Sequence, residues 1–270
     1  MSNNELKINN INLFLSIFFL FLGTFCSAVF FIFPRIFHFD EYLISPIALP
    51  VSYIFTFIVY YFAVMKPQNQ VFRFNYSAKR ISLFLPALLM FIGMAVVAEA
   101  VIGLIPTQGG FLGKWYQEVS GALFGKFEKY PLITIFMVGI IAPFFEETFF
   151  RGFILKGLLN NNMKPEKAIA ISALIFGVFH LNPWQMVGGF LLGLILGLVF
   201  YKTGTLFAGI IIHAINNLLN IAIYSQYGDK RIPEILNISK TLYFSIGFAL
   251  LLIFGYLYLK LTRNYKWNSY

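Results

Sequence analysis

The stretch Ile141-Ala-Pro-Phe-Phe-Glu146-Glu147-Thr-Phe-Phe-Arg151-Gly-Phe-Ile-Leu155 places three ionisable residues inside one apolar segment. Each Glu or Arg near the centre of a bilayer is unfavourable by about 2.5–3.5 kcal/mol on insertion scales. Three of them in one span therefore require a buried polar cavity in which the charges have partners. This placement makes the stretch the predicted working site of the chain.

The composition around this stretch is typical of a polytopic membrane protein. Hydrophobic residues make up 59% of the 270 residues and charged residues only 11%, against roughly 25% in soluble domains. The formal net charge of +9 does not indicate a nucleic-acid partner, because Lys and Arg lie between the apolar runs, as expected of membrane loops. The composition excludes a soluble enzyme and predicts the lipid bilayer as a partner.

Eight apolar runs meet or approach the roughly 20 residues that a membrane span needs. They are residues 11–34, 43–65, 81–105, 131–159, 166–181, 184–201, 206–224 and 241–261. The first run is longer than the apolar core of a signal peptide, which is roughly 7–15 residues, so we retain it as a membrane helix. The sequence predicts an all-α, polytopic membrane helix bundle with about eight transmembrane helices.

The chain is predicted to form a single domain with three parts. Residues 1–130 hold the first membrane helices and an amphipathic segment, which predicts either a helix at the membrane interface or a segment packed on the bundle. Residues 131–222 hold the polar motifs, and residues 223–270 hold a loop and the last membrane helix. A stripe of glycines in the sixth span predicts close helix packing. The glycines are Gly189, Gly193 and Gly197.

Helix geometry separates the roles of the two glutamates. Residues four apart share a helix face, whereas neighbours are rotated by about 100°. Glu147 therefore faces the same way as Arg151, and the simplest role for the two is a buried ion pair. Glu146 is left without that partner, which suits proton acceptance from water. The alternative is that all three form a structural polar cluster that fixes helix register.

Two histidines in apolar spans extend the predicted site. His180 ends Phe176-Gly-Val-Phe-His180, and His213 begins His213-Ala-Ile-Asn-Asn217. His213 and Asn217 project together as two donors that could point at one developing oxyanion, although a lone His or Asn in a membrane is more often interhelical glue. At about 1.5 Å per residue, Glu146 and His180 both lie roughly 20 Å deep, and His213 about 14 Å. One pocket is therefore expected to hold all four groups.

Taken together, these motifs resemble the CAAX protease and bacteriocin-processing (CPBP, or Abi) family of intramembrane proteases over about residues 131–222. The motifs are Glu146-Glu147-x-x-x-Arg151, Phe176-x-x-x-His180 and His213-x-x-x-Asn217. Each motif alone is weak, whereas the set, in this order on successive spans, is specific. The resemblance implies an all-helical endopeptidase that hydrolyses a peptide bond in a membrane-associated or precursor peptide.

The resemblance also implies a role for each motif residue. By this correspondence, Glu146 would be the general base that activates water, and His180 would share that water. His213 with Asn217 would stabilise the tetrahedral oxyanion. The supporting residues would be Glu147 and Arg151.

Metal dependence has two readings in the sequence. Glu146, His180 and His213 supply two imidazoles and a carboxylate, a ligand set that a catalytic zinc could use, and the family is often labelled metalloprotease on that ground. The chain has no His-Glu-x-x-His pairing, and the amide of Asn217 suits oxyanion donation better than zinc ligation. We expect a metal-free, glutamate-activated water, with zinc as the alternative.

Two other classes of function fit a polar membrane cavity. A non-catalytic peptide-binding protein, such as a bacteriocin immunity or scaffold protein, would keep the cavity but would not need an oxyanion hole. A small transporter could use Glu146 and His180 as a proton relay, but the chain lacks the internal repeat that such transporters often show. Glu99 lies near the end of its span, where it could face the same cavity or contact Arg151. Interfacial water is the preferred expectation, so Glu99 stays outside the predicted site.

The expected partner of the site is a peptide or protein substrate at or in the membrane. Prenylated CAAX tails, bacteriocin leader peptides and peptide pheromone precursors all remain open as substrates. Asn- and Lys-rich termini favour a multi-pass protein of a bacterial cell membrane, in which a peptide precursor is the preferred substrate.

Overall fold

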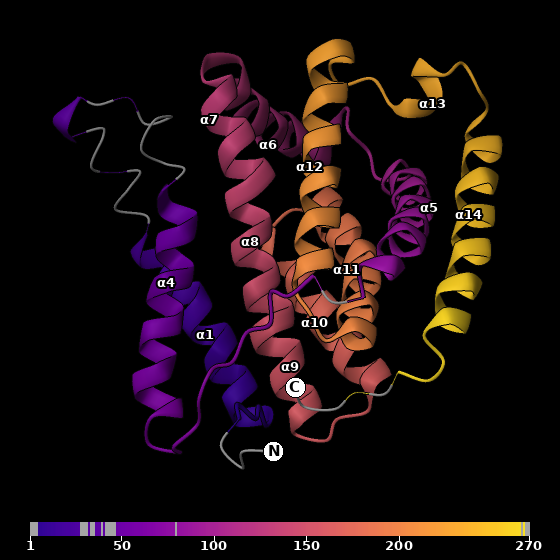
Figure 1. Ribbon diagram of the computed structural model, residues 1–270. Helices are drawn as coiled ribbons and strands as arrows, with labels where there is room; N and C mark the ends of the chain where they lie inside the picture. The colour runs from indigo at the N-terminus through magenta and orange to yellow at the C-terminus, as the bar shows by residue number, and fades with distance from the viewer. Residues whose placement is uncertain are drawn as a thin grey trace.

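The computed structural model describes residues 5–27, 32, 36–38, 40, 47–78, 80–265 and 267. Within these residues the regular structure is helical, apart from one isolated bridge between Glu5 and Val71. Figure 1 shows a bundle with both chain termini at the same end. The helices are α1 (Asn10–Cys26), α4 (Ala48–Tyr60), α5 (Phe84–Ile102), α6 (Gly110–Lys129), α7 (Pro131–Phe136), α8 (Ala142–Glu147), α9 (Lys156–Asn160), α10 (Pro165–Phe179), α11 (Pro183–Thr203), α12 (Phe207–Tyr227), α13 (Ile232–Ile235) and α14 (Lys240–Leu261).

Six helices of the described chain are long and apolar enough to cross a membrane. They are Ala48–Met65, Ile81–Ile102, Pro131–Asn160, Pro183–Thr203, Phe207–Tyr227 and Lys240–Leu261. The other two predicted spans form α1, with 17 residues, and α10, with 15 residues. The all-α membrane bundle is confirmed, with two of the eight helices shorter than a full span. Parts of the first two predicted runs, including residues 43–46, lie outside the described residues.

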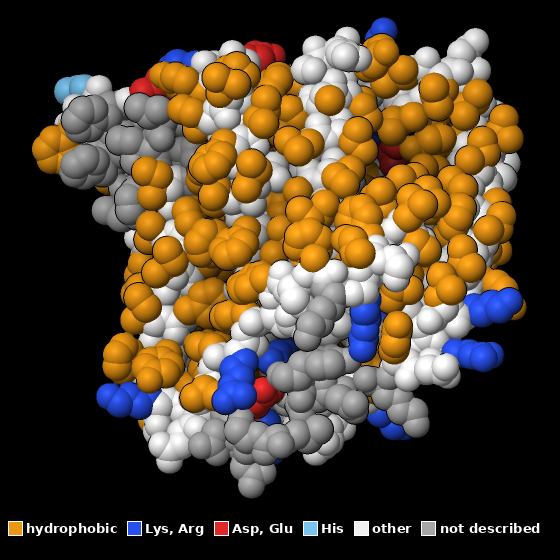
Figure 2. All heavy atoms as spheres, viewed as in Figure 1, with side chains coloured by type: hydrophobic (Ala, Val, Ile, Leu, Met, Phe, Trp, Pro, Cys, Tyr) orange, Lys and Arg blue, Asp and Glu red, His pale blue; other side chains and the backbone are white. Residues whose placement is uncertain are grey.

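The surface agrees with a membrane location. Figure 2 shows hydrophobic side chains over the middle of the molecule, whereas Lys and Arg side chains gather mainly near its lower end. Exposed large hydrophobic residues occur on most of the long helices. An apolar band between charged ends is what a bilayer requires.

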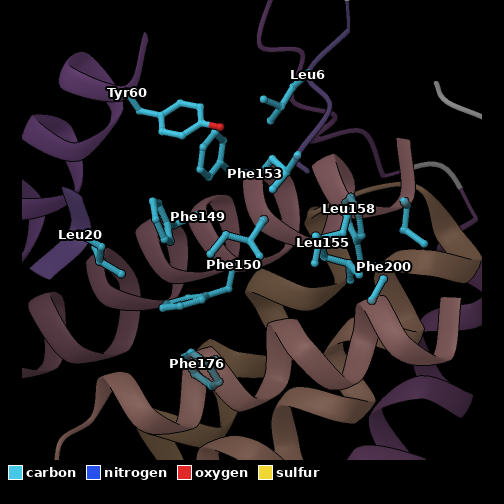
Figure 3. Close-up of a cluster of buried hydrophobic side chains, with 14 of the residues drawn as sticks. Leu6, Leu20, Tyr60, Phe149, Phe150, Phe153, Leu155, Leu158, Phe176 and Phe200 are labelled. Atoms are coloured by element: carbon cyan, nitrogen blue, oxygen red, sulfur yellow. The ribbon is translucent and has the colours of Figure 1, made fainter. Parts of the chain in front are cut away.

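The helix with the two glutamates lies at the centre of the bundle. It runs without a break from Pro131 to Asn160 and contains two π-helical segments, Met137–Ile141 and Thr148–Leu155. Every residue from Thr148 to Leu155 is buried. Figure 3 shows Phe149, Phe150 and Phe153 of this helix facing a core that also includes Leu20 and Tyr60. π-Helical turns inside α-helices are frequent at functional sites.

A short connection fixes His180 between two helices. The α10 helix ends one residue before His180, and Asn182 caps α11 by accepting a hydrogen bond from the backbone N–H of Gln185 at 2.9 Å. Pro183 occupies the first turn of α11, where its missing N–H would be unpaired in any case. The histidine is therefore held at a defined level of the bundle.

The predicted glycine stripe of α11 packs against α10. A Cβ added at Gly193 would lie 3.1 Å from the Cβ of Ala173, and one at Gly197 would lie 3.0 Å from Ile169. A Cβ at Gly189 would lie 3.4 Å from the ring of His180. These separations confirm the predicted close packing, and they bring α11 against the candidate site.

The amphipathic segment forms α6, and its aromatic residues pack on the bundle. The ring centroids of Trp115 and Tyr116 lie 6.0 and 5.1 Å from that of Trp184, at the start of α11. Ser120 donates a hydrogen bond to Asp229 at 3.4 Å. One face of α6 therefore covers the end of the bundle at which α11 begins.

Candidate active site

The ion pair expected between Glu147 and Arg151 is present and buried. Arg151 Nη1 donates to Glu147 Oε1 at 2.8 Å, and each side chain is 1% exposed. The guanidinium also lies 4.6 Å from the ring centroid of Phe176 and donates weakly to the carbonyl of Gly193 at 3.4 Å. The pair thereby links the central helix to α10 and α11.

His213 joins this pair from α12. Its Nδ1 lies 2.9 Å from Glu147 Oε1, the same oxygen that Arg151 contacts. A carboxylate held by an arginine is an acceptor, so His213 Nδ1 carries the proton in this contact. His213 Nε2 faces Glu146, whose Oε2 is 3.7 Å away. The imidazole therefore lies between the two glutamates.

Gly209 allows this approach between helices. A Cβ at Gly209 would lie 3.2 Å from Glu147 Oε2, which is closer than most real Cβ contacts. Glu147 Oε2 is itself buried without a hydrogen-bond partner among the described residues. The absence of a side chain at Gly209 thus gives the carboxylate the room to reach His213.

His180 is oriented by its own helix. Its Nδ1 lies 2.9 Å from the carbonyl oxygen of Phe176, and its ring centroid lies 5.0 Å from that of Phe176 in an edge-to-face arrangement. Because a carbonyl can only accept, Nδ1 donates in this contact. In the neutral ring, Nε2 is then the lone-pair nitrogen and can accept a hydrogen bond.

Asn217 is anchored to the central helix. Its Nδ2 donates to the carbonyl oxygen of Val138 at 2.9 Å, and its Oδ1 accepts from Asn216 at 3.3 Å. Val138 belongs to the π-helical segment Met137–Ile141. One of the two Asn217 amide hydrogens is therefore engaged, and the second remains to donate elsewhere.

A cavity of about 370 Å³ lies beside this network. Its wall includes His180, His213 and Asn217 of the predicted site. Glu146, which is 9% exposed, is not part of that wall and reaches the cavity through its neighbour His213. The structure thus brings three of the four groups to one cavity and places the fourth one contact away. The depths along the helices had predicted one pocket for all four groups, whereas Glu146 lies outside the wall of this cavity.

The cavity also contains polar residues that the sequence interpretation missed. They include Gln185, Asn216 and Asn220. Amide side chains inside an apolar span are themselves a signal of function, and Asn216 and Asn220 are four apart on α12, so they could have been included. Burial raises the pKa of Tyr116, which also lines the cavity, so its hydroxyl stays protonated.

Glu99, which the sequence interpretation left outside the site, contacts partners from the last part of the chain. Glu99 lines the cavity, and its Oε1 accepts a hydrogen bond from the backbone N–H of Ile232 at 2.9 Å. Its Oε2 accepts a short hydrogen bond from the hydroxyl of Tyr243. Both partners lie far along the chain, in the segment that the sequence interpretation treated only as a loop and a last span.

The alternative of a catalytic zinc requires Glu146, His180 and His213 to form one group of ligands. Across the described ranges, no three His, Cys, Asp or Glu side chains form a group that could hold a metal ion. His213 Nε2 lies 3.7 Å from Glu146 Oε2, and His180 contacts the carbonyl of Phe176 through Nδ1, which leaves its Nε2 available. A protein zinc site needs three such ligands within about 2.0–2.2 Å of the ion.

Residues 128–219 match the family model described as Type II CAAX prenyl endopeptidase Rce1-like. This segment belongs to the CAAX protease family. The predicted membership is confirmed over a segment that includes α7 to α11, most of α12 and every candidate catalytic residue. No curated protein and no solved structure matches the chain.

The family match and the helices together indicate the general class of the protein. A CAAX-protease-like segment lies within a chain that has six helices long enough to cross a membrane. The chain is therefore a multi-pass membrane protein that contains a segment similar to the CAAX prenyl protease-like peptidases. The helices α1, α4, α5 and α14 lie outside the matched segment.

Proposed function

We propose that the protein is an intramembrane endopeptidase that hydrolyses a peptide bond in a membrane-associated or precursor peptide. The observation that carries this proposal is the position of His213, which lies between Glu146 and Glu147 on the wall of a cavity. A binding cavity requires neither a histidine fixed by a buried ion pair nor a second carboxylate beside it. Both features serve proton transfer and charge stabilisation during hydrolysis.

In the proposed reaction, Glu146 is the general base. The distance of 3.7 Å between its Oε2 and His213 Nε2 is too long for a direct hydrogen bond and suits a bridging water. Glu146 takes a proton from the water as the water oxygen attacks the peptide carbonyl carbon. It then returns the proton to the departing amine. His180 contributes Nε2 as an acceptor that orients the water.

His213 and Asn217 form the proposed oxyanion hole. Because His213 Nδ1 donates to Glu147, its Nε2 can donate to an oxyanion only when the ring is an imidazolium. Glu147 stabilises that form, much as a buried carboxylate does in a serine-protease triad. Asn217 adds its second amide hydrogen, while the first is held by Val138. Arg151 keeps Glu147 charged and fixed.

The reaction is proposed to proceed without a metal ion. The reason is the donor set: the amide of Asn217 beside His213 suits oxyanion donation better than zinc ligation, and Glu146, His180 and His213 are not grouped as a metal site in the described part of the chain. The proposed location is the cell membrane, and the proposed substrate is a peptide precursor. A prenylated tail is the second candidate.

Replacing Glu146 by Gln tests the enzymatic proposal. The amide keeps the shape of the side chain but cannot accept the proton, so we expect cleavage to be lost while the protein still inserts and folds. The assay compares secreted and membrane-retained peptides by mass spectrometry from cells with wild-type or variant protein. Glu166→Gln is the matched control, because Glu166 is exposed on α10.

Two outcomes of this experiment would contradict the proposal. Unchanged cleavage by Glu146→Gln would eliminate Glu146 as the base. An identical peptide profile with and without wild-type protein would favour the binding-only alternative, an immunity or scaffold protein.

A further inference from the structure

A second cavity adjoins the candidate active site. It also has a volume of about 370 Å³, and it lies between α5, α13 and α14. The two cavities share two lining residues, Glu99 and Arg231. Figure 1 shows α13 at the end of the bundle opposite the chain termini, between α12 and α14. In Figure 2 the surface there is hollowed between hydrophobic walls.

The second cavity is mainly apolar. Its wall includes Val101, Leu104, Pro233 and Phe244. The cavity next to His180 and His213 is more polar because of its amide side chains. A ligand that occupies both spaces therefore has an apolar part and a part that can be hydrolysed or hydrogen-bonded.

Arg231 supplies a cation at the junction. Its guanidinium lies against the backbone of Gly103, where any Cβ would collide with Nη1. Its side chain forms no hydrogen bond or ion pair with any other part of the chain that the structure describes. Glu99 forms no ion pair with Arg231 in the described part of the chain, and its two carboxylate oxygens accept hydrogen bonds from Ile232 and Tyr243.

The local charge favours an anionic ligand. Lys240, at the start of α14, lines the second cavity together with Arg231. Glu99 is the one carboxylate among the described residues of this wall, so the two cations outnumber it. A guanidinium without a partner presents forked donors that match the two oxygens of a carboxylate.

We propose that Arg231 is a substrate-specificity residue that binds a carboxylate of the peptide substrate, at the junction of the active-site cavity and the apolar cavity. This inference rests on the proposed peptidase function. The carboxylate comes either from the free end of the peptide or from an acidic side chain. Arg231 lies outside the segment that matches the family, so the residue belongs to this chain's own substrate selection.

Binding experiments test this proposal without requiring hydrolysis. The protein is purified in detergent as the Glu146→Gln variant, and binding is measured for a short fluorescent apolar peptide as its free acid and as its C-terminal amide. In a second pair, both peptides are amidated at the C-terminus, and one carries Asp where the other carries Asn. We expect one carboxylate-bearing peptide to bind about tenfold more tightly than its neutral partner, a difference of about 1.4 kcal/mol.

Variants of Arg231 then assign the preference. Arg231→Gln should remove it, and Arg231→Lys should keep part of it because the charge remains. Lys230→Gln is the matched control, since it removes the same charge from the neighbouring, exposed residue. If Arg231→Gln does not fold, Gly103→Ala tests the same role of Arg231. The added Cβ displaces the guanidinium but keeps its charge, so the preference for the carboxylate-bearing peptide should weaken.

The outcomes separate this inference from the proposed function. Tighter binding of the free acid than of the C-terminal amide identifies a terminal carboxylate as the ligand of Arg231. Tighter binding of the Asp peptide than of the Asn peptide identifies an acidic side chain. Equal or absent binding in both pairs, or a preference that survives Arg231→Gln, overturns the role of Arg231. A carboxylate preference in a protein that never cleaves peptides would leave this inference standing and remove only the peptidase.

Discussion

Replacing Glu147 by Gln should separate the structural part of the site from its chemistry. Glu147 Oε1 accepts hydrogen bonds from Arg151 at 2.8 Å and from His213 at 2.9 Å. Removing one partner of a buried ion pair costs about 3–5 kcal/mol, because the other charge is left uncompensated. Here we expect about 3 kcal/mol, since the ring of Phe176 and the carbonyl of Gly193 still contact the guanidinium.

The assay combines unfolding in detergent with peptide cleavage. Glu147→Gln should lower the free energy of unfolding and the cleavage rate together. The double variant Glu147→Gln/Arg151→Met removes both charges, so we expect much of the stability to return. Cleavage should not return with it, because His213 has still lost the carboxylate that fixes its ring. Arg151→Met alone is the matched control and should destabilise the protein.

Two results would refute this reasoning. Glu147→Gln with the unfolding behaviour of the wild type would show that the pair contributes nothing to stability. Full cleavage by the double variant would show that Glu147 supports only Arg151 and has no part in orienting His213.

Three further predictions test other parts of the structure. Gly209→Ala would place a Cβ 3.2 Å from Glu147 Oε2; it should reduce the cleavage rate more than the stability, and kinetics with normal turnover would contradict the proposed close approach. Gly93→Ala would place a Cβ 2.5 Å from the backbone nitrogen of Leu251. It should therefore destabilise the packing of α5 on α14 by about 1–3 kcal/mol, and an unchanged unfolding curve in detergent would refute this. Cleavage by purified protein should survive a strong chelator, whereas a loss of activity that Zn²⁺ restores would argue for the metalloprotease alternative.

Local spacing was enough to predict the features that lie within one helix. Hydropathy located the helices because a span needs a continuous apolar run. The Glu147–Arg151 pair followed from residues four apart sharing a face, and the stripe that includes Gly193 followed from the same rule. Each of these depends on one segment and its own periodicity.

Contacts between helices could not be read from spacing. His213 was paired with Asn217 because they share a face of α12, yet its nearest partner is Glu147 on another helix. Asn217 instead reaches Val138 in a π-helical segment. Such segments change the rotation of one helix relative to its neighbours. The sequence pattern did not predict them. The partners of Glu99 lie 133 and 144 residues away, beyond any local pattern.

The summed charge of Arg151, Glu146, Glu147 and His213 gives a reason for the presence of two glutamates in the site. With His213 neutral, Arg151, Glu147 and Glu146 leave a net charge of −1 in a low-dielectric region, which is unfavourable. An imidazolium brings the sum to zero and provides the donor that the oxyanion needs. When Glu146 accepts the proton from water, negative charge moves from Glu146 to the oxyanion while the sum stays zero. In the proposed reaction Glu147 therefore touches no substrate, and its role is to hold the ring of His213 in place through Nδ1.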